Sequence, residues 1–310
     1  MENTRAKTTR NSLILRPPAT IWGMAFVSQS KGMDYMHPFT FNGVRSLIGA
    51  AGILVYILIS RKIAGDKAAK LDWKLNVRAG LLCGIFLTIA STLQQFGIKY
   101  TSVGKAGFIT TLYIIFVPMF GVFLKKKVAP VVWAAAGMAA VGMYLLCMTE
   151  SLRLGAGDIM VFLCAIAFAI QIMTVDHYAA RIDGAVVSCI QFTVCGVVCC
   201  IGALIWGQPT FGQIQEGLGA LLYAGVLSCG VGYTLQIVGQ KGLNPTVAAL
   251  IMSLESVIAT ISGWIAYKIG FLSTDQTLTP RQIAGCVIVF AAVILVQLPP
   301  EWFRFGKKND

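Results

Sequence analysis

The sequence predicts an all-α integral membrane protein in which ten transmembrane helices form two inverted five-helix repeats. Three observations predict this fold: a low share of charged residues, a series of apolar segments long enough to cross a bilayer, and a segment that recurs 142 positions later. Together they imply that lipid surrounds most of the folded chain.

The composition indicates a surface that faces lipid rather than water. Of the 310 residues, 56% are hydrophobic and 12% are charged, and the mean hydropathy is +0.74. A soluble globular domain carries roughly 25% charged residues, and half that share cannot cover a folded surface with polar groups. The net charge of +12 does not indicate a nucleic-acid partner, because Lys and Arg lie in short clusters and form no basic stripe interleaved with aromatic residues.

Ten apolar segments have the length of a membrane span. A helix needs roughly 20 largely apolar residues to cross the hydrocarbon core, with a range of about 17 to 25. The segments are 14–33, 38–60, 79–98, 103–124, 128–148, 157–175, 184–206, 217–239, 245–267 and 281–298. The links between them are too short for a separate soluble domain, which argues against a cytosolic catalytic module.

Basic residues in the links predict the orientation of the spans. With alternate links assigned to opposite faces, 18 of the 25 Lys and Arg residues fall on one side and 6 on the other, while Arg45 lies inside a span. Cytoplasmic loops carry the excess of Lys and Arg. We therefore expect a multi-pass protein of the cytoplasmic membrane, with tails 1–14 and 299–310 both in the cytoplasm.

A short repeat divides the chain into two related halves. The segment Leu93–Lys99 (LQQFGIK) recurs as Leu235–Lys241 (LQIVGQK), 142 positions later. In this register the first repeat is 15–148 and the second is 153–298, with five spans each. Because five is odd, the second copy would enter the membrane upside down, as in many secondary transporters. The alternative is that two apolar segments converged on a similar sequence.

The cysteines do not indicate a metal site or a disulfide scaffold. Most of the nine lie inside apolar runs, and no Cys-x-x-Cys motif occurs. Structural metal sites usually need such ligands at fixed spacing, whereas a free cysteine packs as a small hydrophobic residue. The sequence therefore predicts reduced packing cysteines and no cofactor.

Several motifs lie along the chain in the order typical of one transporter family. They are Ile21–Val27 (IWGMAFV), Pro38 followed by Arg45, Tyr100–Gly107 (YTSVGKAG), Val117-Pro118, Ser253–Val257 (SLESV) and Gly263-Trp264. Together they resemble the EamA family of the drug/metabolite transporter superfamily over residues 15–298. The resemblance implies ten helices in two inverted repeats, and transport of amino acids or other small metabolites.

The chain departs from the family at two span ends. The family often closes spans four and nine with a Leu-Gly-Glu stretch. Here span four ends in Leu124–Lys127 (LKKK) and span nine in Tyr267–Gly270 (YKIG). No role of those glutamates is therefore carried over to this chain.

Three charged residues are candidates for the substrate pathway. A charge at the centre of a span costs roughly 2.5–3.5 kcal/mol or more, so an ionisable residue there is a functional candidate. Arg45 lies about 10 Å and Glu255 roughly 18 Å from the outer ends of their spans, at ~1.5 Å per residue. One hypothesis is that both line a single polar cavity. Alternatively, Arg45 extends outward to the interface and Glu255 bonds a hydroxyl or backbone group. Lys105 either attracts an anionic substrate or extends to the interface.

Uncharged polar residues inside the spans also need partners, because an unsatisfied group in lipid costs several kcal/mol. They are Gln29, Gln94, Gln95, Thr110, Tyr113, Gln171, Gln191, Tyr233 and Gln236. We expect about half of them to line the pathway, with Tyr113, Gln94 and Gln236 foremost and Gln171 also a candidate. Trp22 either stacks on a substrate ring or packs inside the protein.

These features favour a secondary transporter or exporter that moves a small metabolite by alternating access. No nucleotide-binding motif is present, so ATP is not the direct energy source. An enzyme is disfavoured, because the sequence has two histidines and no paired aspartates or nucleophile motif. A channel or a non-transporting scaffold remains an alternative. The sequence leaves open the substrate, the direction, a coupled proton and a homodimer.

Overall fold

The computed structural model describes residues 10–65, 71–125, 128–147, 155–273, 276–277 and 279–297. All the regular secondary structure of these residues is helical. Each of the ten predicted spans overlaps a helix, but seven of the described helical segments are long and apolar enough to cross a membrane. The first predicted span is a helix of 17 residues, and the fifth and tenth contain shorter apolar helices, Pro130–Gly142 and Pro280–Leu295.

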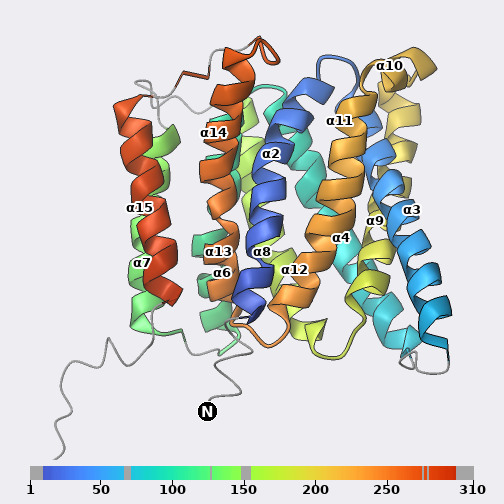
Figure 1. Cartoon of the computed structure of the whole chain (residues 1–310), viewed down its shortest axis with the longest axis horizontal. Helices are drawn as coiled ribbons and strands as arrows, with labels where there is room; N and C mark the ends of the chain where they lie inside the picture. The colour runs from blue at the N-terminus through green and yellow to red at the C-terminus, as the bar shows by residue number, and fades with distance from the viewer. Residues whose placement is uncertain are drawn as a thin grey trace, which may run out of the picture.

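The helices follow one another with short connections (Figure 1). In chain order they are α2 (Arg16–Gly32), α3 (Pro38–Ala64), α4 (Trp73–Ile98), α5 (Val103–Thr111), α6 (Tyr113–Phe123), α7 (Pro130–Cys147), α8 (Ala156–Ala179), α9 (Gly184–Gly202), η2 (Ala203–Gly207), α10 (Phe211–Glu216), α11 (Leu218–Leu222), η3 (Tyr223–Gly232), α12 (Tyr233–Gln240), α13 (Pro245–Met252), α14 (Leu254–Lys268) and α15 (Pro280–Gln297).

Four predicted spans are not the continuous α-helices that the sequence suggested, and the seventh of the ten ends in the π-helix η2 (Ala203–Gly207). A turn at Leu112 separates α5 from α6, and a turn at Ser253 separates α13 from α14. The eighth span contains η3, a π-helix of 10 residues. Apolar periodicity cannot reveal such breaks, and π-helical segments occur frequently at functional sites.

Local sequence explains where the helices begin. The side chain of Ser102 accepts a hydrogen bond from the backbone of Lys105 at the start of α5. Asn244 caps α13 in the same way through Thr246, and Pro245 follows as the first helical residue. Such side-chain oxygens satisfy backbone groups that have no partner within the helix, and proline fits the first position because it lacks the N–H.

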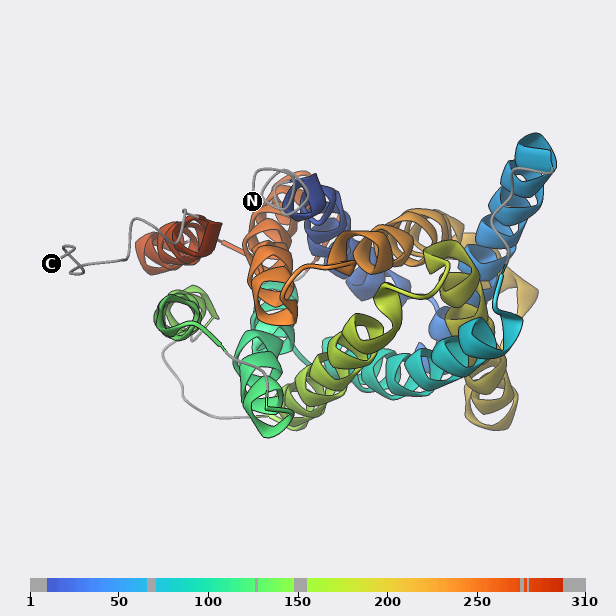
Figure 2. The ribbon, with the colours of Figure 1, turned by 90° about the horizontal axis from the view of Figure 1, so that it is seen from below.

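The helices stand side by side. The start of α2 and the end of α15 lie at the same end of the bundle, the lower one in Figure 1. The main packing pairs are α3 on α9, α4 on α8 and α9, α2 on α14, and α7 on α15. Figure 2 shows the α7–α15 pair at one edge, beside the rest of the bundle. An added Cβ at Gly142 of α7 would lie 2.8 Å from the carbonyl oxygen of Gly285, so small residues allow these two helices to approach closely.

The distribution of polarity is that of a protein in lipid. Large apolar side chains such as Leu58, Leu204 and Val287 are more than half exposed. Polar side chains are buried instead, and Gln171 and Gln191 have no exposed surface. A multi-pass membrane protein is expected to show this arrangement, because amides in hydrocarbon need partners inside the bundle.

Candidate functional site

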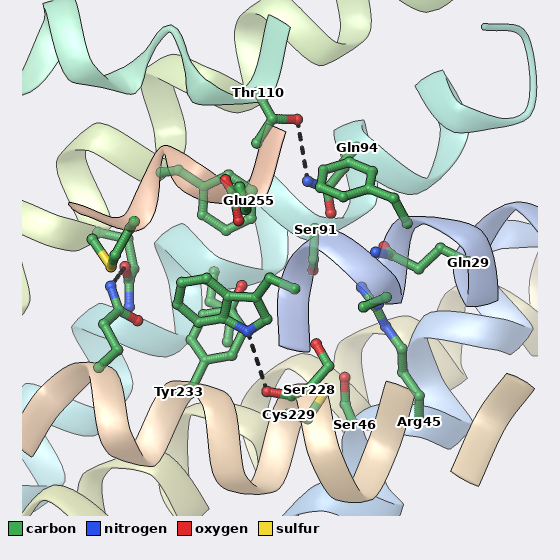
Figure 3. Close-up of a pocket in the computed structure, with 18 of the residues that line it drawn as sticks. Gln29, Arg45, Ser46, Ser91, Gln94, Thr110, Ser228, Cys229, Tyr233 and Glu255 are labelled. Atoms are coloured by element: carbon green, nitrogen blue, oxygen red, sulfur yellow. Dashed lines mark hydrogen bonds between the residues drawn. The ribbon is translucent and has the colours of Figure 1, made fainter. Parts of the chain in front are cut away.

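A narrow cavity of about 40 Å³ lies between the central helices of the bundle. Most of its lining comes from α2, α3, α4, α8, α12 and the neighbourhoods of the two helix breaks (Figure 3). The lining residues are Trp22, Ala25, Phe26, Gln29, Arg45, Ser46, Leu87, Ser91, Gln94, Thr110, Tyr113, Phe168, Gln171, Ile172, Phe192, Ser228, Cys229, Tyr233, Gln236, Met252 and Glu255. This space has room for about three water molecules at roughly 10–15 Å³ each, so a larger solute requires the surrounding helices to move apart.

Most of the residues selected from the sequence meet in this cavity. Those in the lining are Arg45, Glu255, Gln94, Gln236, Tyr113, Trp22, Gln171, Gln29, Thr110 and Tyr233, whereas Gln95 and Gln191 are not part of it. Although the two charged residues lie 210 positions apart in the chain, they face the same space.

Lys105 does not join this group. Its Nζ atom lies 2.6 Å from Oδ2 of Asp158, at the start of α8. The same carboxylate accepts hydrogen bonds from Thr101 and from the backbone of Gly155. Lys105 therefore ties α5 to α8, and its ammonium already has an anionic partner.

Glu255 lies in the first turn of α14 and is 4% exposed. Its Oε1 atom accepts a hydrogen bond of 3.0 Å from the hydroxyl of Tyr113, the first residue of α6. No basic side chain of the described residues lies within 4.0 Å of it. The carboxyl group is held by a phenol and faces the cavity without a cation.

Arg45 enters the cavity from α3 and is 5% exposed (Figure 3). Its guanidinium lies over the ring of Phe41, 5.4 Å from the ring centre. Within the described chain, Nε has no hydrogen-bond partner and no acidic side chain lies within 4.0 Å. Arg45 is thus a buried cation without a protein anion beside it.

The amides of the lining are only partly satisfied. Gln236 donates to Oε1 of Gln171 at 3.3 Å, and Gln94 donates to the hydroxyl of Thr110 at 3.2 Å. The remaining atoms without a partner in the described residues include Oε1 of Gln29, Nε2 of Gln171 and Oε1 of Gln236. These atoms are available to a bound solute or to water.

Trp22 has a partner in the protein. Its Nε1 atom donates to the carbonyl oxygen of Ser228 at 3.3 Å, and its ring centre is 4.7 Å from that of Tyr233. The indole therefore connects α2 to η3 and α12, while it also forms part of the cavity wall.

The lining contains many pairs of residues separated by 142 positions, the spacing of the sequence repeat. The pairs are Phe26 and Phe168, Gln29 and Gln171, Leu87 and Cys229, Ser91 and Tyr233, Gln94 and Gln236, Thr110 and Met252, and Tyr113 and Glu255. The last pair is joined by a hydrogen bond. Matched positions from both halves of the chain thus meet around one cavity.

Comparison with known proteins identifies the family of the chain. The model of the EamA-like transporter family matches the chain twice, over residues 16–148 and 155–298. The chain belongs to the EamA-like transporter family.

Similar proteins in this family are named as transporters. An uncharacterized transporter of Archaeoglobus fulgidus is 27% identical over 90% of this chain and 83% of its own length. The uncharacterized transporter YwfM of Bacillus subtilis is 24% identical over 94% of each chain. These likenesses and the apolar helices identify a multi-pass membrane transporter of the drug/metabolite transporter type.

The fold of this family member is also similar to a solved crystal structure. The TM-score is 0.73, with 16% sequence identity, over 96% of this chain and 99% of the other. At that identity the likeness concerns the fold alone.

Sequence reasoning missed several lining residues of this transporter. Ser46, Ser91, Ser228 and Cys229 carry small polar groups that are common in membrane helices, so residue type alone did not distinguish them. The repeat held a usable signal for one of them, because Ser91 stands 142 positions before Tyr233.

Among the described residues, no group of three or more His, Cys, Asp or Glu side chains could hold a metal ion.

Proposed function

We propose that the chain is a secondary transporter that moves a small metabolite of amino-acid type across the cytoplasmic membrane by alternating access. In this proposal ten spans form two inverted five-span repeats, and both ends of the chain are cytoplasmic. The substrate occupies the cavity between the repeats, and gradients of substrate or protons supply the energy.

The observation that carries the proposal is the composition of the cavity wall. Positions 142 residues apart both contribute to it, and Tyr113 of one half donates a hydrogen bond to Glu255 of the other. A two-fold axis through the cavity would place equivalent residues in this way. In transporters built from inverted repeats, the substrate site lies at such an interface near the middle of the membrane.

Helix packing adds support, because the contacts occur in equivalent pairs. The contact of α4 with α8 corresponds to that of η3 and α12 with α2. The contact of α5 and α6 with α8 corresponds to that of α13 and α14 with α2. The pairs α3–α9 and α7–α15 each join equivalent spans. Alternating access then requires one set of contacts to open while the equivalent set closes.

The charges of the cavity favour a substrate of amino-acid type. A buried arginine and a buried glutamate face the same space without forming a salt bridge. A zwitterion would offer each of them an opposite charge, and a buried charge is tolerated only when it is paired. A sugar would leave both charges unpaired.

Counterflow into proteoliposomes tests the proposal. Vesicles that contain the full chain are loaded with one unlabelled solute from a panel of leucine, phenylalanine, glutamate, lysine, choline, glucose and uridine, and are then given a trace of the same solute in labelled form. A carrier accumulates the label transiently above the level in protein-free vesicles. A channel gives equilibration without overshoot and a scaffold gives no uptake, and either result for the whole panel contradicts the proposal.

A further inference from the structure

We propose that Arg45 and Gln29 form a subsite for the carboxylate of the substrate, and that the second half of the chain supplies an apolar subsite for the substrate's body. The proposal rests on the transport function proposed above and deepens it. It assigns the cavity to small monocarboxylates with an apolar body, oriented with the carboxylate toward α2 and α3.

The first step is the electrostatic state of Arg45. A guanidinium stays charged at any physiological pH, and this one is 95% buried with an unpaired Nε. The acidic residue of the cavity wall, Glu255, is not within salt-bridge distance and is held by Tyr113. Since a buried charge is costly without an opposite charge, the substrate is the natural source of the anion.

The second step is the shape of the donor group. A guanidinium presents a planar fork of N–H donors that matches a carboxylate with two parallel hydrogen bonds. The amide of Gln29 lies on the same side of the cavity as the guanidinium, and Ser91 lies beside them (Figure 3). Nε2 of Gln29 can donate to a carboxylate lone pair that the guanidinium leaves free, whereas the hydroxyl of Ser91 already donates to the carbonyl oxygen of Thr88.

Packing around a single thiol fixes one wall of this subsite. The hydroxyls of Ser46 and Ser91 lie 3.5 and 3.4 Å from the sulfur of Cys195. Because Ser46 adjoins Arg45 on α3 and Ser91 lies on α4, the thiol holds these two helices in register. The carboxylate subsite is therefore built from α2, α3 and α4, with α9 behind it.

The third step is the contrast with the equivalent positions in the second half. Where the first half places the hydroxyls of Ser91 and Thr110, the second half places Tyr233 and Met252. Phe168, Ile172 and Phe192 extend this apolar side. Around Glu255, such a wall favours an aliphatic or aromatic body and disfavours several hydroxyl groups on that body.

A counterflow experiment with matched analogues tests the subsite. Labelled leucine is the probe, and unlabelled leucine, leucinamide, isopentylamine and 4-methylpentanoate are the competitors. We expect leucine and 4-methylpentanoate to compete, and the two compounds without a carboxylate to be weaker by about 10- to 100-fold, because a hydrogen bond to a charged group contributes about 1.5–3 kcal/mol. Equal competition by leucinamide overturns the proposal. Transport of choline or glucose but of no carboxylate also overturns it, while the carrier function stands.

Substitutions test which residues are responsible for the preference for a carboxylate. In Arg45→Gln, the preference for leucine over leucinamide should fall to about one, and Arg45→Lys should restore part of it because the charge remains. Retained preference in Arg45→Gln overturns the proposal. Thermal unfolding and gel filtration of each purified variant confirm that it is folded.

The repeat supplies a matched control. Gln29→Leu should reduce the preference for leucine over leucinamide severalfold. Gln171→Leu changes the equivalent position in the second half, and it should weaken both compounds equally. If Gln171→Leu instead removes the discrimination and Gln29→Leu keeps it, the carboxylate lies on the other side of the cavity and the assignment is wrong.

Discussion

Two helix crossings, separated by 142 positions, use different chemistry at equivalent places. In the first, Gly97 of α4 packs on Gly157 and Val161 of α8. In the second, Gly239 of α12 packs on Leu15, next to α2. Both glycines allow two helices to approach closely, as small residues do in membrane bundles.

Charge distinguishes the two crossings. The first carries the salt bridge between Lys105 and Asp158. In the 142-position register the corresponding residues of the second crossing are Val247 and Arg16, which cannot form the same pair. The comparison teaches that the two halves retain the same crossing, while the Lys105–Asp158 pair is specific to the first of them.

The largest expected effect comes from breaking that salt bridge. Asp158→Asn leaves Lys105 without its acidic partner, and removing one member of a buried pair costs about 3 kcal/mol. Thermal unfolding of the purified protein measures the loss. Asp34→Asn is the control, because the pair of Lys31 and Asp34 is partly exposed at 24% and 51% and should contribute at most about 1 kcal/mol. Equal effects of the two variants would show that the charged crossing is not the stronger one.

The next largest effect is a difference in stability between substitutions of Gly97 and of Gly239. A Cβ at Gly97 would lie 2.8 Å from the backbone oxygen of Gly157 and would also meet the side chain of Val161. A Cβ at Gly239 would meet only side-chain atoms among its nearest neighbours, with Leu15 at 2.7 Å. Because a side chain can move more easily than backbone, Gly97→Ala should cost about 1–3 kcal/mol of stability and Gly239→Ala less. The opposite order, measured by thermal unfolding, contradicts this explanation.

A smaller effect concerns the hydrogen bond beside the second crossing. Nδ2 of Asn11 donates to the carbonyl oxygen of Lys241 at 2.6 Å. Asn11→Ala should cost about 1 kcal/mol, because the carbonyl loses its donor. Hydrogen exchange should become faster near the end of α12 and remain unchanged near the start of α8. Faster exchange at both ends would mean that the crossings are not independent.

The smallest effect concerns the caps of two equivalent helices. His37 caps α3 by accepting from the backbone N–H of Phe39, whereas Asp183 caps α9. Burial, and to a lesser extent the charge of Lys99, lowers the pKa of His37 below its usual value. The neutral imidazole is therefore favoured in the folded protein. The stability that this cap contributes is lost as the pH falls below about 6.5. His37→Asn, which keeps an acceptor, should reduce the acid sensitivity of thermal stability by about 0.5 kcal/mol. An unchanged pH profile contradicts this role.

The sequence predicted the positions of the helices well, because a helix in lipid needs apolar residues along its whole length. It also predicted the cavity residues whose burial in a span is costly, such as Arg45, Glu255 and Gln94. It could not find the breaks at Leu112 and Ser253, since Leu112 is apolar and single serines are common within membrane helices. Those breaks bring Tyr113 and Glu255 to the starts of α6 and α14.

Lys105 illustrates a second limit of prediction from the sequence, which is that the partner of a charged residue is not visible there. Its partner Asp158 lies 53 positions away, at the start of another helix. A charge at the end of a span looks the same in the sequence whether it faces water, substrate or a buried carboxylate. Only the packing of α5 against α8 decides between these environments.

The orientation of the second half is the premise of the whole account, and a topology reporter tests it most directly. One reporter is joined to the N-terminus and another after Leu152, in the connection between α7 and α8. We predict that the first reporter is active in the cytoplasm and that the second is active only beyond the membrane. If both reporters are cytoplasmic, the second half is not inverted, and alternating access around the shared cavity is contradicted.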